Sequence, residues 1–186
     1  MKLPITPAAG QTDVALRLFH CIPMLALLVP VCAGGLRAQE VPPAWMRVDT
    51  AARAVSLKLE VTAPPGSASP LISGYREGGA QIVVPRGWTV AWQWESHDST
   101  APHSLVLMAE REKIPTEGGR PAIDNAMTRA VTTGLEAGSR DVTSFEADQV
   151  GWYWLLCGVP GHAIKGEWIG FKVDLEATGP TVVEKR

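Results

Sequence analysis

Short runs in which apolar and polar residues alternate constrain the fold of this chain more than any other feature. Every second residue is apolar or aromatic in two such runs, residues 54–62 (Val55, Leu57, Leu59, Val61) and residues 88–96 (Trp88, Val90, Trp92, Trp94). Successive side chains of a β-strand point to opposite faces of its sheet, so a period of two indicates a strand with one buried face. Aromatic and β-branched residues at this spacing fit a core between two sheets.

Turn residues separate further short strands along the chain. Such strands are predicted over residues 81–85, 103–108, 140–145, 151–157 and 168–175. The 186 residues include 18 Gly and 15 Pro, which favours many turns and argues against a helical bundle. About seven short strands with one long connection indicate an all-β fold, a Greek-key antiparallel β-sandwich. Within the long connection, residues 124–131 are predicted to form two helical turns.

The N-terminal segment is typical of a targeting sequence. Lys2 and Arg17 precede an apolar run over residues 21–33, and small residues follow this run. The run has the length of a signal-peptide core and is shorter than the ~20 residues that a membrane-spanning helix needs. We therefore predict that residues 1–38 form an export signal, with an uncleaved anchor over residues 21–33 as the alternative. The protein is expected in the periplasm or outside the cell, membrane-bound only if this segment is retained.

The remaining chain is predicted to contain one folded domain. Residues 39–54 are interpreted as a lead-in, residues 55–176 as the domain and residues 177–186 as a flexible tail. The formal net charge is −2 and no cluster of Lys or Arg is present, so nothing indicates nucleic-acid binding. We expect a monomer whose partners are other proteins.

The segment over residues 151–168 contains the residue types that carry chemistry. It reads Gly-Trp-Tyr-Trp-Leu-Leu-Cys-Gly-Val-Pro-Gly-His-Ala-Ile-Lys-Gly-Glu-Trp, so Cys157 stands five residues before His162. Removal of residues 1–38 leaves Cys157 as the only cysteine, and a lone thiol in an exported protein is a liability unless it is buried or ligated. A thiolate and an imidazole on one short loop suit a transition metal, copper above all. His103, which follows Ala-Pro at a predicted strand start, would complete a His₂Cys set.

These motifs resemble the cupredoxins and are most similar to the sulfocyanin and rusticyanin type, in which the spacing from cysteine to histidine is long. The matching residues are 84–92, 102–107 and 151–168, and the resemblance covers roughly residues 55–175. It implies that residues 55–176 are a copper-binding domain, with one type 1 or modified type 1 copper ion per chain bound by His103, Cys157 and His162. It also implies that Ser104 ties the two ligand segments together and that electrons pass through the edge of His162.

Glu167 is the point at which the chain departs from this family. The weak axial methionine of the family falls ten residues after the cysteine, and Glu167 occupies that position. A carboxylate ligand is a hard anion that favours Cu(II) over Cu(I) and lowers the reduction potential. Alternatively, the Glu167 side chain faces solvent and leaves copper with three ligands. Met108 and Met127 are other candidates, although neither stands at the family position.

The resemblance implies an exported mononuclear copper protein that carries single electrons between redox partner proteins. The alternative is a red-copper protein of the nitrosocyanin kind, or a copper carrier, with a carboxylate ligand and without fast electron transfer. An enzyme is not favoured, because a copper enzyme needs a second histidine-rich site. With His103 and His162 assigned, His97 is the only histidine left outside residues 1–38. His97 lies in a polar loop and is expected to be exposed.

Overall fold

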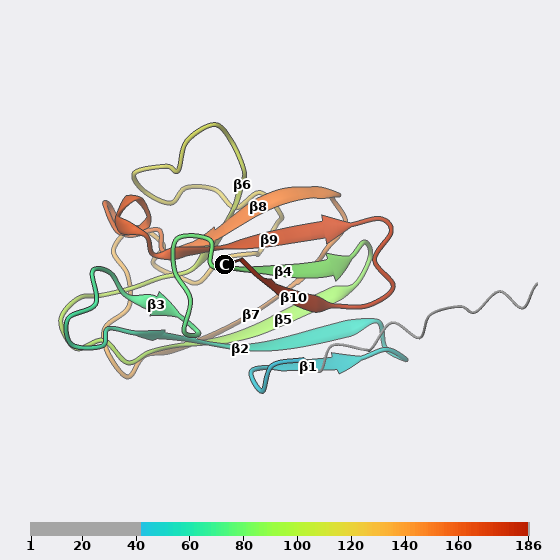
Figure 1. The fold of residues 1–186 in the computed structure, drawn as a ribbon, viewed down its shortest axis with the longest axis horizontal. Coiled ribbons are helices and arrows are strands. Elements are labelled where there is room, and N and C mark those ends of the chain that lie inside the picture. The colour runs from blue at the N-terminus through green and yellow to red at the C-terminus, as the bar shows by residue number, and fades with distance from the viewer. Residues whose placement is uncertain (1–41, 186) are drawn as a thin grey trace, which may run out of the picture. The chain divides into compact units, whose positions relative to one another are not determined.

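Two β-sheets face each other in the computed structural model, which describes residues 42–185 (Figure 1). The first sheet has the order β1 (Met46–Asp49), β2 (Ala54–Thr62), β5 (Thr89–Ser96) and β7 (Arg140–Glu146), with β3 (Leu71–Ile72) paired to β2. The second has the order β10 (Thr181–Glu184), β4 (Ala80–Pro85), β9 (Trp168–Asp174), β8 (Gly151–Leu156) and β6 (Val106–Ala109). The predicted signal or anchor, residues 1–38, lies outside the described residues.

The alternating residues of the predicted strands form the core between the two sheets. Val55, Leu57, Leu59 and Val61 of β2 and Trp88, Val90, Trp92 and Trp94 at β5 are all buried. The ring of Trp92 packs edge-on against Phe145 of β7, with centroids 5.2 Å apart. The second sheet adds residues such as Ile82 and Phe171 to the same cluster. The prediction of an all-β sandwich with this buried face is therefore confirmed.

The strand pairing differs from the expected arrangement because two pairs are parallel. Strand β2 runs parallel to β5, with Ala54 opposite Thr89, and β4 runs parallel to β9, with Gln81 opposite Gly170. The other pairs between the named strands are antiparallel, so both sheets are mixed. Alternation within a strand reports which face is buried and contains no information on the direction of the neighbouring strand.

Three segments are ordered differently from their predictions. Strand β1 lies in the expected lead-in, and β10 lies in the expected flexible tail, where Thr181 pairs with Val83 of β4. The helical turns predicted over residues 124–131 do not form. Asn125 and Ala130 have positive φ angles of 65° and 53°, which a right-handed helix does not tolerate. This segment instead contacts β6 through a bridge between Met127 and Val106.

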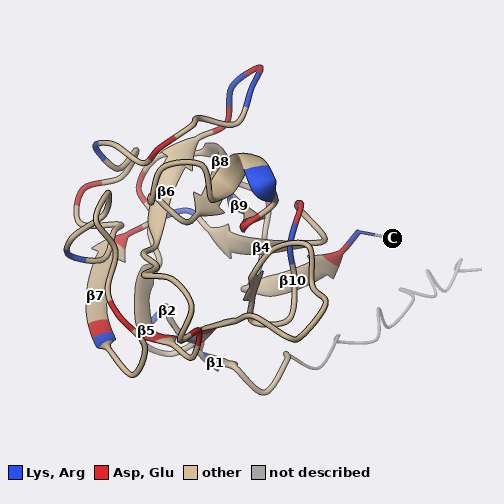
Figure 2. Cartoon of the chain, turned by 90° about the vertical axis from the view of Figure 1, so that its left-hand side faces the viewer, with Lys and Arg blue, Asp and Glu red and all other residues tan. Residues whose placement is uncertain are grey.

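Charged residues stand mostly on loops and on the outer faces of strands (Figure 2). Within residues 42–185, the buried carboxylates are those of Asp98 and Glu167, and both contact His103. Burying a carboxylate is costly unless it is paired, so this grouping is a candidate functional site. In the part of the chain that the structure describes, no helix has the length and apolar character needed to span a membrane.

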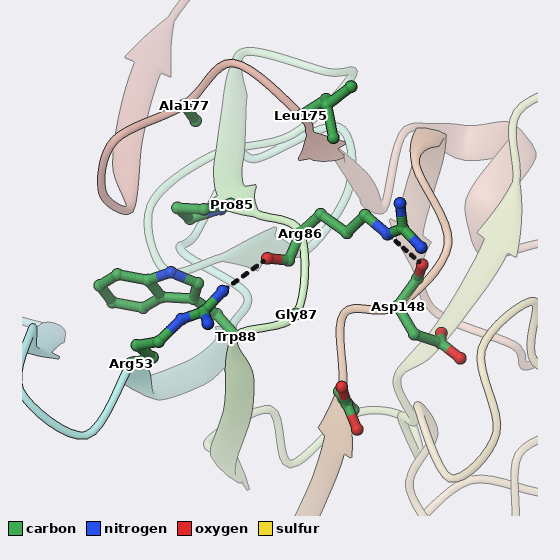
Figure 3. Close-up of a pocket in the computed structure, with 9 residues that line it drawn as sticks. Arg53, Pro85, Arg86, Gly87, Trp88, Asp148, Leu175 and Ala177 are labelled. Atoms are coloured by element: carbon green, nitrogen blue, oxygen red, sulfur yellow. Dashed lines mark hydrogen bonds between the residues drawn. The ribbon is translucent and has the colours of Figure 1, made fainter.

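The strand ends farthest from Cys157 surround a pocket of about 520 Å³ (Figure 3). Arg53 donates a hydrogen bond to the Arg86 carbonyl oxygen at 3.4 Å, and Arg86 donates to the Asp148 carbonyl oxygen at 3.2 Å. The residues predicted as ligands are not among those that line this pocket. The chemistry expected from the sequence lies at the opposite end of the sandwich.

Candidate metal centre

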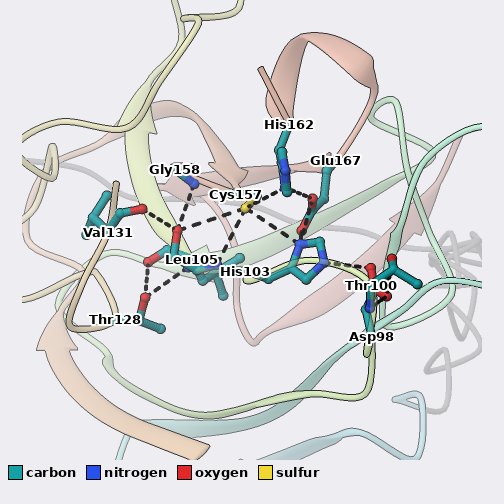
Figure 4. A network of polar contacts seen from close by, with 11 residues as sticks. Asp98, Thr100, His103, Leu105, Thr128, Val131, Cys157, Gly158, His162 and Glu167 are labelled. Atoms are coloured by element: carbon teal, nitrogen blue, oxygen red, sulfur yellow. Dashed lines mark hydrogen bonds and ion pairs between the residues drawn. The ribbon is translucent and has the colours of Figure 1, made fainter. Parts of the chain in front are cut away.

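The four residues predicted as copper ligands lie together at one end of the sandwich (Figure 4). One potential ligand atom from each of His103, Cys157, His162 and Glu167 lies within 4.8 Å of the others. The first two and Glu167 are fully buried, whereas 19% of the His162 side chain is exposed. Two imidazole nitrogens, a thiol sulfur and a carboxylate form a donor set that suits a transition metal.

The connection between β8 and β9 supplies three of these four side chains. Strand β8 ends directly before Cys157, and β9 begins directly after Glu167. Antiparallel pairing of Leu156 with Trp168 brings the two strand ends together. The backbone N–H of Cys157 then donates to the carbonyl oxygen of Glu167 at 3.1 Å. The hairpin therefore places thiol and carboxylate side by side.

A tight turn places His162 between these two residues. Its backbone N–H donates to the Val159 carbonyl oxygen at 3.1 Å, and the 3₁₀-helix η1 (Ala163–Lys165) follows. Gly166 ends this helix with φ 108°, in a region that favours glycine. A Cβ atom at this position would also lie only 2.7 Å from the Glu77 side chain. Gly166 thus reverses the chain directly before Glu167.

His103 reaches the centre from the segment that precedes β6. Its backbone forms two hydrogen bonds with Leu135, of 3.1 Å and 2.8 Å. The next residue, Ser104, donates its backbone N–H to Cys157 Sγ at 3.4 Å. The Ser104 hydroxyl accepts the Gly158 N–H at 3.0 Å and donates to the Val131 carbonyl oxygen at 2.6 Å. Ser104 therefore joins the two ligand-bearing segments, as the family resemblance implies.

The Glu167 carboxylate faces both imidazole rings. Its two oxygens lie 2.8 Å and 3.0 Å from His103 Nδ1, and Oε2 lies 3.0 Å from His162 Nδ1. Cys157 Sγ lies 3.9 Å and 3.6 Å from the same two nitrogens. Because Glu167 is fully buried, the structure excludes the alternative in which its side chain faces solvent.

The other side chains considered from the sequence lie outside the cluster. Met108 packs against a separate apolar group around Trp154, and Met127 is 38% exposed. The His97 side chain is 43% exposed, and its Nε2 lies 3.9 Å from the nearest oxygens of Glu60 and Glu95. Of the side chains considered for a fourth donor, Glu167 is therefore the one that lies in the cluster.

Pairing between the two imidazoles and the two anionic side chains determines which groups of this cluster are protonated. Burial lowers the pKa of His103, but hydrogen bonds to Cys157, Glu167 and Asp98 outweigh it and raise the pKa to about 10. Hydrogen bonds to Cys157 and Glu167 raise the pKa of His162 to about 9. Burial alone would raise the pKa of Cys157 and of Glu167, yet their hydrogen bonds to the two imidazoles hold both values below the ordinary range. Cys157 and Glu167 therefore carry negative charge that the two protonated imidazoles balance. A metal cation would replace the imidazole protons and balance the same negative charge.

Asp98 is a site residue that the sequence did not predict. Its Oδ2 lies 2.8 Å from His103 Nε2, and its Oδ1 accepts the backbone N–H and the hydroxyl of Thr100 at 2.8 Å and 2.6 Å. Asp followed two residues later by Thr is a pattern that favours a side-chain-capped turn. That pattern indicates a loop and does not report that the carboxylate is only 3% exposed.

A groove of about 260 Å³ opens beside the centre. Asp98, His103 and His162 contribute to its wall, together with Lys165 and the loop over residues 63–70. His103 is itself fully buried, so the exposed part of the cluster beside this groove is the edge of His162. It does not include Cys157 or Glu167 among its lining residues.

Comparison with known proteins identifies the family. Residues 43–184 match the sulfocyanin (SoxE) domain. Sulfocyanin from Sulfolobus acidocaldarius is 28% identical over 118 residues, which are 60% of this chain and 59% of that protein. The aligned region therefore spans less than two thirds of the curated relative.

Solved structures of two other proteins are also similar to this chain. Rusticyanin from Thiobacillus ferrooxidans has 21% identity and a TM-score of 0.43, covering 70% of this chain and 86% of that chain. Auracyanin from Roseiflexus castenholzii has 18% identity and a TM-score of 0.43, covering 63% and 96%. The family assignment rests on the match over residues 43–184, which spans almost all the described residues. The chain belongs to the sulfocyanin family of cupredoxins.

Proposed function

We propose that this protein is an exported electron carrier with one copper ion, bound by His103, Cys157, His162 and Glu167. The observation that carries the proposal is the convergence of Cys157 Sγ and two imidazole Nδ1 atoms at 3.6 Å and 3.9 Å. Membership in the sulfocyanin family supports the same function. The predicted signal segment supports a location in the periplasm or outside the cell.

The chemistry of the donor set fits copper in both oxidation states. A soft thiolate suits Cu(I), imidazoles suit either state and a carboxylate favours Cu(II). Copper bound there would supply a one-electron couple. The protein contributes a buried frame, in which the Ser104 hydrogen bonds and the ends of β8 and β9 hold the donors in place. A frame that changes little between charge states lowers the cost of transferring an electron.

His162 is the proposed exit for the electron. It is the one member of the cluster that keeps an exposed edge, at 19%, and Ile164 beside it in the same turn is 56% exposed. An apolar surface around a redox-active edge favours short-lived contact with a partner protein. We propose that redox partners dock at this turn and that the protein acts as a monomer without catalytic activity of its own.

The burial of Glu167 supports a second candidate function. A carboxylate ligand stabilises Cu(II) and would produce a red-copper protein or a copper carrier with slow electron exchange. The rate of electron self-exchange between oxidised and reduced protein separates the two functions. Fast self-exchange supports an electron-transfer protein, and slow self-exchange supports a red-copper protein or a copper carrier.

The proposal is tested by loading the protein with copper and recording metal content, visible absorption and EPR. We expect one copper per chain and a thiolate-to-copper absorption band in the wild type. Cys157→Ser should lose the band because it removes the thiolate, whereas the matched control His97→Gln should keep it. A wild-type protein that is colourless when loaded with Cu(II) would contradict the proposed site.

A further inference from the structure

We propose that Asp98 is a positioning residue of the copper centre. Its carboxylate selects the ring nitrogen of His103 that faces the other donors, and its negative charge favours the oxidised metal. This inference rests on the proposed function and adds a residue that lies outside the four clustered donors. It is carried by the contacts on the two sides of the His103 ring.

The imidazole of His103 is held between two carboxylates. Its Nε2 lies 2.8 Å from Asp98 Oδ2, and its Nδ1 lies 2.8 Å from Glu167 Oε1. An ionised carboxylate accepts hydrogen bonds and cannot donate, so Nε2 must carry the hydrogen that it shares with Asp98. Glu167 accepts from Nδ1 in the same way, so without metal the ring carries a hydrogen on each nitrogen. Copper would displace the hydrogen of Nδ1, which faces Cys157 and Glu167, whereas the Nε2 hydrogen would stay with Asp98. Asp98 thereby keeps Nε2 protonated and leaves Nδ1 for the metal.

Asp98 is itself held in a single orientation. Thr100 donates two hydrogen bonds to Oδ1, of 2.8 Å and 2.6 Å, which leaves Oδ2 for His103. Asp98 is 3% exposed, and within residues 42–185 its ion-pair partner is His103 rather than a Lys or Arg. A carboxylate that is anchored at one oxygen and shares the other with a ligand ring fixes the orientation of that ring.

The charge of Asp98 should also influence the redox equilibrium. The thiolate of Cys157 and the carboxylate of Glu167 together balance the two positive charges of Cu(II). Asp98 adds a further buried anion, which bulk water and salt screen only weakly. Reduction of Cu(II) to Cu(I) would remove one positive charge next to these anions. The charge of Asp98 therefore disfavours reduction and lowers the reduction potential. The hydrogen bond from His103 also makes its imidazole more basic, which favours Cu(II) in the same direction.

The charge effect is tested with the full chain loaded with copper, using Asp98→Asn. This variant removes the charge and keeps the size of the side chain, and its one amide oxygen can accept either from Thr100 or from His103. Loss of the charge and loss of the His103 hydrogen bond both favour Cu(I), so the expected direction is the same in either orientation. At a fixed applied potential we expect the ratio of reduced to oxidised protein to rise about tenfold, equivalent to a shift of about 59 mV. The matched control is Glu60→Gln, which removes a partly exposed carboxylate that pairs with Lys58 and should leave the ratio unchanged. Equal potentials for the two variants would overturn the charge effect.

The positioning effect is tested by ¹⁵N NMR of the diamagnetic Cu(I) form. In the wild type we expect the hydrogen of His103 on Nε2, with slow solvent exchange. Asp98→Ala should accelerate that exchange at least tenfold because it removes the acceptor, whereas the control Glu60→Gln should leave it unchanged. A hydrogen on Nδ1 in the wild type would overturn the inference even if neither variant folds.

The two proposals fail in different ways. A wild type without a thiolate-to-copper band contradicts the proposed function. A wild type with the band, whose potential does not respond to Asp98→Asn, contradicts only the role of Asp98.

Discussion

Glu167 shows how one substitution at the residue scale changes the chemistry expected of a family. A buried carboxylate is stable only when it is paired, and Glu167 lies within 3.0 Å of both His103 Nδ1 and His162 Nδ1. Its spacing from Cys157 was sufficient to identify it as the candidate fourth donor. Its burial required the three-dimensional structure, because Gly166 and the β8–β9 hairpin direct it inward.

Replacing Glu167 with Met should raise the reduction potential, because the variant removes a hard anion that favours Cu(II). The expected increase is on the order of 100–200 mV, since each factor of ten in the equilibrium corresponds to about 59 mV. Spectroelectrochemical titration measures it, and the visible band should shift as well. Glu112→Gln removes an exposed carboxylate and serves as the control. Unchanged potential and spectrum in Glu167→Met would show that Glu167 is not a ligand.

Copper affinity should depend on pH because the metal competes with protons for two imidazoles. The pKa values of about 10 for His103 and about 9 for His162 mean that both rings are protonated at neutral pH. Raising the pH removes these protons, so the apparent affinity increases, by up to about tenfold per pH unit for each displaced proton. Chelator competition between about pH 6 and 8 measures the slope. An affinity independent of pH, after correction for the chelator, would contradict this expectation.

At the scale of elements, close backbone packing beneath the ligand loops should be sensitive to single methyl groups. A Cβ on Gly158 would lie 2.8 Å from the Val131 carbonyl oxygen, closer than side chains normally approach. Gly158→Ala should therefore lower the free energy of unfolding by about 1–3 kcal/mol. It should also perturb the copper spectrum, because the Gly158 N–H bonds to Ser104.

Urea unfolding and the visible spectrum measure the effect of Gly158→Ala. The matched control is Gly179→Ala, which adds a methyl group where no atom lies within 4 Å. Equal stability of the two variants would show that the loops adapt to the extra volume.

The elements differ in how far the sequence predicts them. Strands β2 and β5 were predictable because burial alternates along a single chain segment. The antiparallel hairpin of β8 and β9 was predictable as two strands joined by the ligand loop. The parallel pairs and the ordered β10 depend on segments far apart in the chain, which no local pattern encodes. Asp98 stands only five residues before His103, but that spacing in a polar loop does not report that its carboxylate is buried and faces the ring. Positive φ angles at Asn125 and Ala130 similarly reflect packing against β6 and overrule helical preference.

At the scale of the whole molecule, copper should stabilise the fold because its donors come from two separate segments. A ligand that binds only the folded state adds about 2.7 kcal/mol at a free concentration one hundred times its Kd. Removing copper with a chelator should therefore lower the Tm of the wild type, measured by thermal unfolding. Cys157→Ser should show a smaller difference between the two conditions. Identical Tm values with and without copper would contradict a site shared between segments.

The placement of three donors on one hairpin loop also has a consequence for the order of folding. Cys157, His162 and Glu167 lie within a short stretch, whereas His103 is 54 positions from Cys157 along the chain. Closing a short loop costs less conformational entropy than closing a long one. In an unfolded chain, copper can therefore bind Cys157, His162 and Glu167 before it binds His103. His103 joins them only when β6, which follows it, pairs with β8, where Val106 lies opposite Leu156. Pairing between segments this far apart in the chain is slow to form. Copper present during refolding would thus organise the β8–β9 hairpin first.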